Sequence, residues 1–329
     1  MATATTTVPG GANPSAGSRR FLSRLREGDE IARLITLIFA GVVVLIVVAL
    51  VYQLWRDSVL PRHKFGWHFF VTGVWDPVFD QFGALPFIYG TVVTSAVGLL
   101  IAVPLGLGAA IFLAELAPAK ISDTLTFFID LLAAVPSVIY GLLGVFILVP
   151  LLRQYGEPAL GKTLGFLPLF QGPPFGVGFL AAGIVLAVMV IPFIISVSRE
   201  VLLSVPREQR EAALSLGATR WESTWKVVVP FARTGIFGSI FLALARALGE
   251  TMAVTMVIGN APEIHKSLLA NGASMASVIA NEFAEATSDL HRSALVEIAL
   301  ALFVVTIIVN AIAQVLVWAV TRGTPSQAH

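Results

Sequence analysis

Residues 177–197 read VGFLAAGIVLAVMVIPFIISV, an apolar run without a charged side chain. A helix of about 20 apolar residues crosses the hydrocarbon core of a bilayer, which is about 30 Å thick. This run therefore predicts a transmembrane helix. Of the 329 residues, 57% are hydrophobic and only 12% are charged, whereas about a quarter of the residues of a soluble domain are charged. The composition indicates that most of this fold is solvated by lipid.

Five further apolar runs predict additional spans on both sides of the first, at residues 34–55, 85–113, 125–152, 234–258 and 294–320. The predicted fold class is an all-α polytopic membrane protein with about six transmembrane helices. Pro104, Pro136 and Pro192 lie inside these runs, where neighbouring helices can satisfy a freed carbonyl, so we expect kinks there. Small residues predict close helix packing, namely Gly98, Gly106, Gly108, Gly141 and Gly144.

The connections between the spans predict the domain organisation and the orientation. Residues 1–18 are rich in Thr, Ala, Gly, Ser and Pro and predict a disordered tail. An N-terminus in the cytoplasm leaves most of the connecting lysines and arginines inside. We therefore expect both termini to be cytoplasmic. The predicted segments are a cytoplasmic tail (1–18), a basic flank with the first span (19–56), an extracytoplasmic loop (57–84), a five-helix core (85–320) and a second cytoplasmic tail (321–329).

Composition also excludes several classes of function. The chain has no cysteine and a net charge of only +1, and its basic residues form no stripe of the kind that binds nucleic acid. No nucleophile–base pair or metal-ligand cluster can be recognised, so we expect neither an enzyme nor a bound cofactor or metal. Residues 156–163, GEPALGKT, match the spacing of a phosphate-binding loop. An apolar helix precedes them in place of the required strand, so we assign no ATP binding to them.

The connection after the run at 177–197 contains residues 205–222, VPREQREAALSLGATRWE. Pro206 suits the first turn of a short helix, and Gly217 suits the left-handed residue that follows its end. Thr219 and Glu222 have the spacing of a capping box, which predicts a second helix running toward Pro230. The pattern predicts two helices joined at a glycine turn on the membrane surface.

This connection resembles a known family. Glu211, Ala212 and Ala213, followed by Gly217 and by the residues VVVP at 227–230, are similar to the EAA loop of permease subunits of ATP-binding-cassette importers. The resemblance implies an importer-permease core of the MetI-like type. It also implies that residues 205–230 form a coupling loop, whose helix docks on a separate ATPase subunit where ATP is hydrolysed.

Four ionisable residues lie inside the predicted spans, where each costs about 2.5–3.5 kcal/mol on insertion scales. Asp130 and Glu297 lie near span ends, which favours structural roles. Arg246 lies in the middle of residues 234–258, and Glu250 follows it by one helical turn, close enough to pair. Two readings stay open: a static buried ion pair, or an arginine that binds an anionic substrate while Glu250 holds its side chain between transport events. A guanidinium suits the second role because its planar fork donates to two oxygens at once.

The sequences around Arg246 narrow the resemblance. Residues 246–254 (RALGETMAV), 258–260 (IGN) and 134–141 (AVPSVIYG) are similar to the permeases of high-affinity phosphate importers, and residues 274–283 (SMASVIANEF) are similar to the C-type subunit of that pair. The implied substrate pathway contains Arg246, Glu250, Ser137 and Thr251.

The same resemblance implies partners in a bacterial plasma membrane. These are a second permease subunit that completes a heterodimer, two ATP-binding subunits and an extracytoplasmic phosphate-binding protein. Two alternatives remain at this point. One is a permease for another oxyanion, such as sulfate or molybdate. The other is a secondary transporter with Asp130 or Glu250 as a proton site, which the lack of a visible inverted repeat disfavours.

Overall fold

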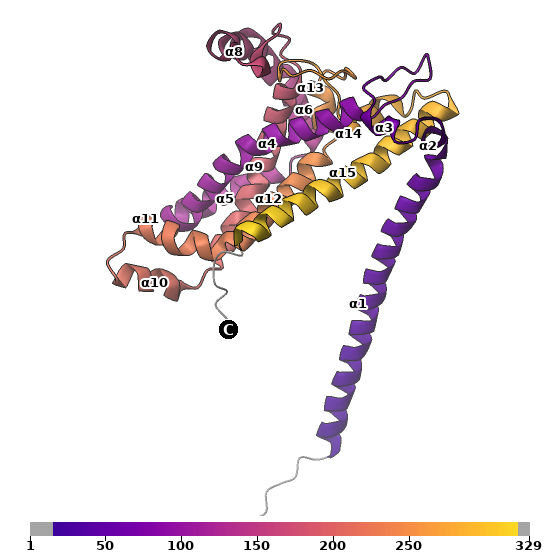
Figure 1. The fold of residues 1–329 in the computed structure, drawn as a ribbon. Coiled ribbons are helices and arrows are strands. Elements are labelled where there is room, and N and C mark those ends of the chain that lie inside the picture. Colours follow the sequence, from indigo (N-terminus) through magenta and orange to yellow (C-terminus); the bar gives the residue numbers. More distant parts are fainter. Residues whose placement is uncertain (1–15, 322–329) are drawn as a thin grey trace, which may run out of the picture. The chain divides into compact units, whose positions relative to one another are not determined.

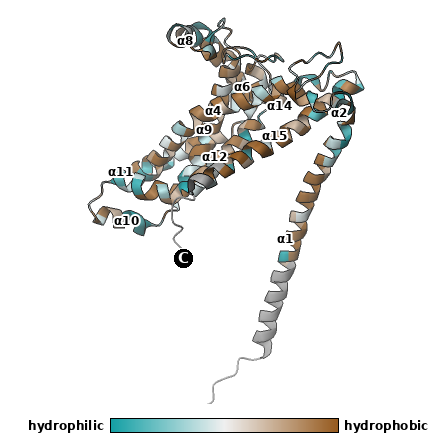
Figure 2. Cartoon of the chain, viewed as in Figure 1, coloured by the Kyte–Doolittle hydropathy of each residue, from teal (hydrophilic) through white to brown (hydrophobic). Residues whose placement is uncertain are grey.

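The computed structural model describes residues 16–321, and within them the ordered elements are helices without a strand (Figure 1). Six of the described helices are long and apolar enough to cross a membrane, and their apolar lengths are coloured brown in Figure 2. These candidate spans are Ala32–Asp57, Leu85–Leu116, Ser137–Leu164, Phe179–Leu203, Arg220–Leu248 and Asp289–Val315. The all-α, six-span prediction is confirmed.

The chain divides into two compact units, Met1–Gln53 and Leu54–His329. The first unit is occupied by the helix α1, which runs over Ala16–Asp57 and enters the second unit with its last residues. The side chains of residues 32–50 are exposed, as expected of a helix whose neighbours are lipid. Most of the tail predicted at 1–18 lies outside the described residues, and Ala16–Ser18 already belong to α1.

The connection predicted at 57–84 folds into a small aromatic layer. It contains the short helices α2 (Val59–Phe65) and α3 (His68–Val71). Trp75 lies at its centre, with its ring 4.8 Å from the ring of Phe82 and 5.0 Å from that of Phe87. These rings pack against α14 (Met275–Glu282) and α15 (Asp289–Thr321), so that this segment is attached to the C-terminal helices.

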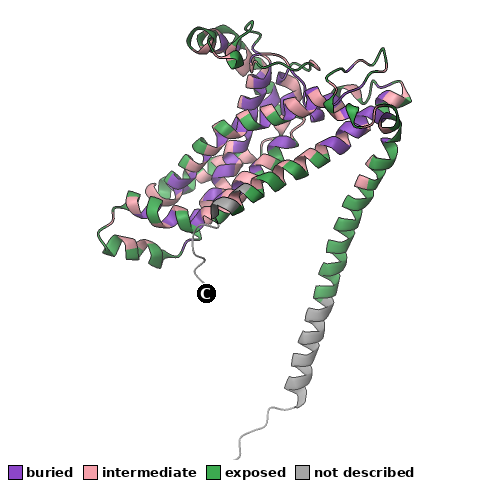
Figure 3. Ribbon diagram, in the orientation of Figure 1, coloured by how far each residue is buried: buried purple, intermediate pink, exposed green. Residues whose placement is uncertain are grey.

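The centre of the second unit is the contact between α4 (Leu85–Ile111) and α9 (Phe179–Leu203), and most of the α9 span is buried (Figure 3). A Cβ atom at Gly98 would lie 3.0 Å from Leu186 Cβ, and one at Gly106 would lie 2.8 Å from Ile194 Cγ2. The predicted close packing is confirmed at these two glycines, whereas Gly108 faces open space.

The third predicted span, residues 125–152, is wrong in its bounds. A helix ends before Pro136, and a new one begins after it, because proline has no N–H to donate and restricts the residue before it. Asp130 therefore lies on α5 (Ala119–Ala133), outside the candidate spans. The span itself consists of α6 (Ser137–Leu143), a π-helical turn (Gly144–Leu148), α7 (Val149–Leu151), a second π-helical turn (Leu152–Gly156) and α8 (Glu157–Leu164).

The fifth predicted span, residues 234–258, also has different bounds. A continuous helix begins with α11 (Arg220–Ser223), passes through the π-helical turn Thr224–Val228 and continues as α12 (Val229–Leu248). Pro230 lies in the first turn of α12, where its missing N–H is tolerated after the wider turn. The helix ends at Leu248, and α13 (Met252–Val257) follows after a break. The prediction missed both the early start and this break.

Candidate functional site

The helix α10 (Arg207–Ser215) has none of its side chains buried. Gly217 follows it with φ of 87°, and two hydrogen bonds close the helix end, from Gly217 N to Leu214 O (3.0 Å) and from Ala218 N to Ala213 O (3.2 Å). This pair of bonds is a Schellman motif. The predicted left-handed glycine is thus confirmed.

The second helix begins at the predicted capping box. Thr219 Oγ1 accepts a hydrogen bond from Glu222 N at 3.2 Å, and Thr219 N donates to Glu222 Oε2 at 3.0 Å. The predicted helix, glycine turn and helix are therefore present. Backbone hydrogen bonds close the end of the first helix, and bonds between side chains and backbone close the start of the second.

This segment, residues 207–225, is called the α10 surface below. Glu211 and Ala212 are exposed and Ala213 is half-buried. Apolar side chains are exposed beside them: Leu216 is 89% accessible, and Trp221 and Trp225 form an exposed pair with ring centroids 5.6 Å apart. Figure 3 shows α10 as mostly exposed. Exposed leucine and tryptophan beside a charged helix are typical of a surface that binds another protein.

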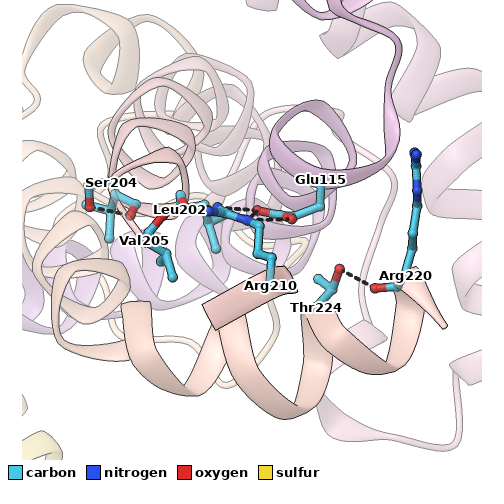
Figure 4. A network of polar contacts seen from close by, with 8 residues as sticks. Glu115, Leu202, Ser204, Val205, Arg210, Arg220 and Thr224 are labelled. Atoms are coloured by element: carbon cyan, nitrogen blue, oxygen red, sulfur yellow. Dashed lines mark hydrogen bonds and ion pairs between the residues drawn. The ribbon is translucent and has the colours of Figure 1, made fainter. Parts of the chain in front are cut away.

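One arginine holds α10 against the spans. Arg210 Nη2 lies 2.8 Å from Glu115 Oε1, and Arg210 also donates to the carbonyl oxygens of Val205 (2.5 Å) and Leu202 (2.7 Å) (Figure 4). The side chain of Glu115 is only 9% exposed. Glu115 ends the α4 span, and Leu202 lies in the last turn of α9, so α10 is bonded to the ends of both central helices. Sequence reasoning missed this pair.

A second arginine joins neighbouring helices at the same end of the molecule. Arg199, near the end of α9, donates to Ser122 Oγ at 3.1 Å and lies 3.5 Å from Asp123 Oδ1. Ser122 in turn donates to Leu113 O at 2.8 Å. These contacts connect α5 and α9 with the end of the α4 span, close to the base of the α10 surface.

The predicted pairing of Arg246 with Glu250 is wrong. The helix ends at Leu248, so Glu250 does not lie one turn further on the same face. Glu250 Oε1 instead accepts a hydrogen bond from Ala253 N (3.2 Å) in the first turn of α13. Arg246 is exposed, with its Cζ atom 5.8 Å from the ring centre of Phe193, and it forms no ion pair with any described residue.

Two helix breaks lie beside each other near this arginine. The helices α6 and α13 pack together, and a Cβ atom at Gly141 would lie 3.2 Å from Ala253 Cα and 2.6 Å from Met256 Sδ. Gly144 is likewise close to Val257, so the two helices run in the same direction. Ser137 therefore begins α6 on the side of the molecule where Thr251 precedes α13. Both residues are half-buried.

Asp130 and Arg246 both lie beside α9, next to the half-buried residues Ser196 and Phe193. Ser196 donates a hydrogen bond to Asp130 Oδ1, and Phe193, one turn earlier on α9, lies under Arg246. Asp130 and Arg246 are both exposed within this chain. We call this side the α9 face, defined by Asp130, Phe193, Ser196 and Arg246. Arg246 belongs to a candidate span, where an ionisable side chain is costly and is a candidate for function, whereas Asp130 lies outside the candidate spans.

The remaining predicted features lie elsewhere. Glu297 is fully buried in α15, away from the α9 face. Most of residues 156–163 are helical, and Glu157 Oε2 accepts a hydrogen bond from Gly176 N at 2.9 Å. A helix without a preceding strand offers no phosphate-binding loop.

Comparison with known proteins identifies the family. Residues 102–322 match the model of the binding-protein-dependent transport system inner membrane component. The chain is 44% identical to the phosphate transport system permease protein PstC of Xylella fastidiosa over 96% of each chain. It is 46% identical to PstC of Pasteurella multocida over 87% of this chain and 91% of that one, and 39% identical to the probable PstC of Methanocaldococcus jannaschii over 88% and 93%.

Solved structures share the fold at low sequence identity. A bacterial alginate ABC transporter, solved with an alginate-bound periplasmic protein, aligns over 91% of this chain and 98% of that chain, with a TM-score of 0.60 and 14% identity. The inward-facing MetNI methionine ABC transporter aligns over 74% and 99%, with a TM-score of 0.51 and 16% identity. The chain is therefore a multi-pass membrane permease that belongs to the family of inner membrane components of binding-protein-dependent transport systems.

Proposed function

We propose that this chain is the permease subunit of an ATP-driven phosphate importer and forms half of its translocation pathway. The single observation that carries the proposal is Arg246, an exposed arginine at a helix break within the spans, without an ion-pair partner among the described residues. A permanently charged guanidinium suits a tetrahedral oxyanion, to which it donates two parallel hydrogen bonds. The relatives with 39–46% identity, all named as phosphate permeases, support the same substrate.

In this proposal the substrate crosses along the α9 face, between this chain and a second permease subunit. Ser137 and Thr251 contribute hydroxyl groups beside Arg246, at the start of α6 and just before α13. Glu250 holds the first turn of α13 through Ala253 N, and so fixes the break that presents Arg246. The sequence predicts Glu250 as the resting partner of Arg246. In this proposal Glu250 instead shapes the helix break.

The α10 surface is proposed as the coupling site. Glu211, Ala212, Ala213 and Gly217 belong to a helix that is closed at its C-terminal end and anchored by Arg210, so that it transmits a displacement without unwinding. Its occupant is a separate ATP-binding subunit, of which the assembly has two. An extracytoplasmic phosphate-binding protein delivers the substrate on the opposite side. In this proposal both termini lie in the cytoplasm of a bacterial cell.

Uptake of radiolabelled phosphate tests the proposal. The chain is expressed with the other subunits of its transporter in cells that lack their own phosphate importers. We expect ATP-dependent phosphate uptake that excess sulfate and molybdate do not inhibit. A chain carrying Gly217→Val serves as the uncoupled control, because its α9 face is unchanged. Uptake of sulfate or molybdate in place of phosphate would assign the permease to another oxyanion, and uptake without the ATP-binding subunits would favour a secondary transporter.

A further inference from the structure

A cavity of 510 Å³ lies beside α15, away from the α9 face. Its wall includes side chains from α2, α4 and α15 and the end of α1. The charged and aromatic members are Arg62, Glu297, Trp55 and Trp67, whereas Val304 and Ile308 belong to its aliphatic part. On α15 the eleven helical steps from Glu297 to Ile308 span about 16 Å, at 1.5 Å per step. This is about half the thickness of the hydrocarbon core, which is the depth of one leaflet.

The carboxylate of Glu297 is not satisfied by the protein. Its residue is fully buried, and neither oxygen has a hydrogen-bond partner among the described residues. A buried carboxylate without a donor is strongly disfavoured in an apolar environment, so this group requires a cation, a hydrogen-bond donor or a proton. Glu297 belongs to the wall of the cavity beside it, and its carboxylate meets a ligand there once the side chain turns toward the cavity.

Arg62 lies in the same wall but forms no ion pair with Glu297. Its guanidinium is stacked over the ring of Trp55 at 3.8 Å, and its Nε donates to Ser58 O at 3.0 Å. A second nitrogen, Nη2, donates to Trp55 O. The arginine is thereby fixed with Nη1 still free of a described acceptor. The cavity thus presents a fixed cation and an unsatisfied anion near two tryptophans.

We propose that this cavity binds a phospholipid with an amine-bearing, zwitterionic headgroup, of the phosphatidylethanolamine type. The ammonium donates to Glu297, the phosphodiester accepts from Arg62, and one acyl chain lies along Val304 and Ile308. The order of groups along the cavity favours a lipid, because polar groups and tryptophan lie toward one end and aliphatic side chains follow along α15. An anionic lipid without an amine satisfies Arg62 but offers Glu297 only neutral donors and no positive charge.

Lipid retained by the purified complex tests the proposal. The full-length chain and its partner subunits are purified from a membrane that contains both phosphatidylethanolamine and phosphatidylglycerol, and the retained lipids are quantified by mass spectrometry. Two variants remove the site in different ways. Glu297→Gln removes the anion at nearly constant volume. Val304→Trp fills the cavity from a position that is 45% exposed, so that the core is not repacked.

Each variant has a matched control. Glu285→Gln changes an exposed carboxylate, and Val315→Trp adds the same ring to an exposed position on α15 that does not line the cavity. We expect the wild-type complex to retain phosphatidylethanolamine in preference to phosphatidylglycerol. Both site variants should retain at least about five-fold less of this lipid. In Glu297→Gln the reason is the loss of one charged hydrogen bond, which is worth about a factor of ten, and in Val304→Trp it is the filled cavity. The controls should retain it.

Several results would contradict the proposed lipid site. Equal phosphatidylethanolamine in wild type, Glu297→Gln and Val304→Trp would overturn the proposal. So would retention of phosphatidylglycerol alone. A Glu297→Gln complex that unfolds at a higher temperature while it keeps its lipid would show that the carboxylate is simply a buried, protonated group. Phosphate uptake is measured in parallel. If a site variant loses phosphate uptake but keeps its phosphatidylethanolamine, the lipid site is contradicted. The proposed transport function is unaffected by that result.

Discussion

Arg210 and Glu115 are 95 residues apart in sequence, and Arg210 Nη2 lies 2.8 Å from Glu115 Oε1, in a contact that bonds a surface helix to the end of a membrane span. The same guanidinium reaches two carbonyl oxygens at the end of α9 (Figure 4). The side chain of Arg210 therefore bonds α10 to the ends of both central helices, α4 and α9.

Removing either member of this pair should loosen α10. We expect Glu115→Gln or Arg210→Gln to cost about 2–3 kcal/mol, because the remaining charge is partly buried without its partner. The measurements are the midpoint of thermal unfolding of the purified assembly and its substrate-stimulated ATPase activity. Arg207→Gln is the control, since Arg207 is exposed on the same helix. Equal effects of the change at 207 and at 210 would contradict the anchoring role.

The left-handed backbone at Gly217 gives a second prediction. An added Cβ atom would meet nothing within 4 Å. Any loss of stability on substitution of Gly217 is therefore caused by its left-handed backbone, with φ of 87°, and not by crowding. Gly217→Val should cost about 1–2 kcal/mol locally and redirect the second helix. Gly161→Val is matched to it, with open space and a helical backbone. We expect only the change at 217 to abolish copurification of the ATP-binding subunit. Normal copurification would refute the assigned coupling role.

Arg246 gives a third prediction, on the substrate side. Arg246→Lys keeps the charge and loses the planar fork, so phosphate uptake should fall by at least ten-fold while the assembly stays intact. Arg153→Lys, at an exposed position elsewhere, should leave uptake unchanged. Uptake is compared with the amount of assembled complex in the membrane. A fall in uptake that only follows a fall in assembly would make Arg246 structural.

Glu250 gives a fourth prediction, which follows from its hydrogen bond to Ala253 N. Glutamine keeps an oxygen that can accept this bond, whereas alanine does not. We therefore expect Glu250→Gln to keep most of the uptake and Glu250→Ala to lose about 1 kcal/mol of stability together with most of the uptake. Equal uptake by the two variants would show that the hydrogen bond to α13 is irrelevant.

Orientation gives the last prediction. A cysteine introduced at Gly161 should react with an impermeant thiol reagent from outside the cell, and one at Ser215 should react only after the membrane is opened. Both positions are exposed, and the chain has no cysteine of its own to contribute background. Reversed labelling would invert the topology and remove α10 from the cytoplasm.

The sequence predicted those parts of the fold that depend on local chemistry. Apolar length predicts a span, and the glycine and the Thr219–Glu222 pair predict helix ends, because each is decided within a few residues. At Pro136 the sequence predicts a kink within one span, where the structure has a break between two helices, and the break after Leu248 is not predicted. In a membrane, a proline or a glycine is compatible with a continuous helix or with a break, and neighbouring helices decide which one forms.

The candidate site likewise contains features that local sequence predicts and features that depend on distant segments. Gly217 and the capping box were found from spacing, whereas the pairing of Arg246 with Glu250 assumed an unbroken helix. The bond between Arg210 and Glu115 joins residues from distant segments, which a local pattern does not reveal. A weak signal existed, since Glu115 is a lone carboxylate at the end of a long apolar run.

The glycines between α4 and α9 have a mechanical consequence. With Leu186 and Ile194 this close to Gly98 and Gly106, the two helices have no clearance in which to slide. A displacement of α10 is therefore transmitted to both helices together, through the short connection to α9 and the bonds of Arg210. The displacement of each transport cycle must then be absorbed where the backbone hydrogen bonding is interrupted, at the helix breaks before Ser137 and after Leu248, beside the arginine proposed to bind the substrate.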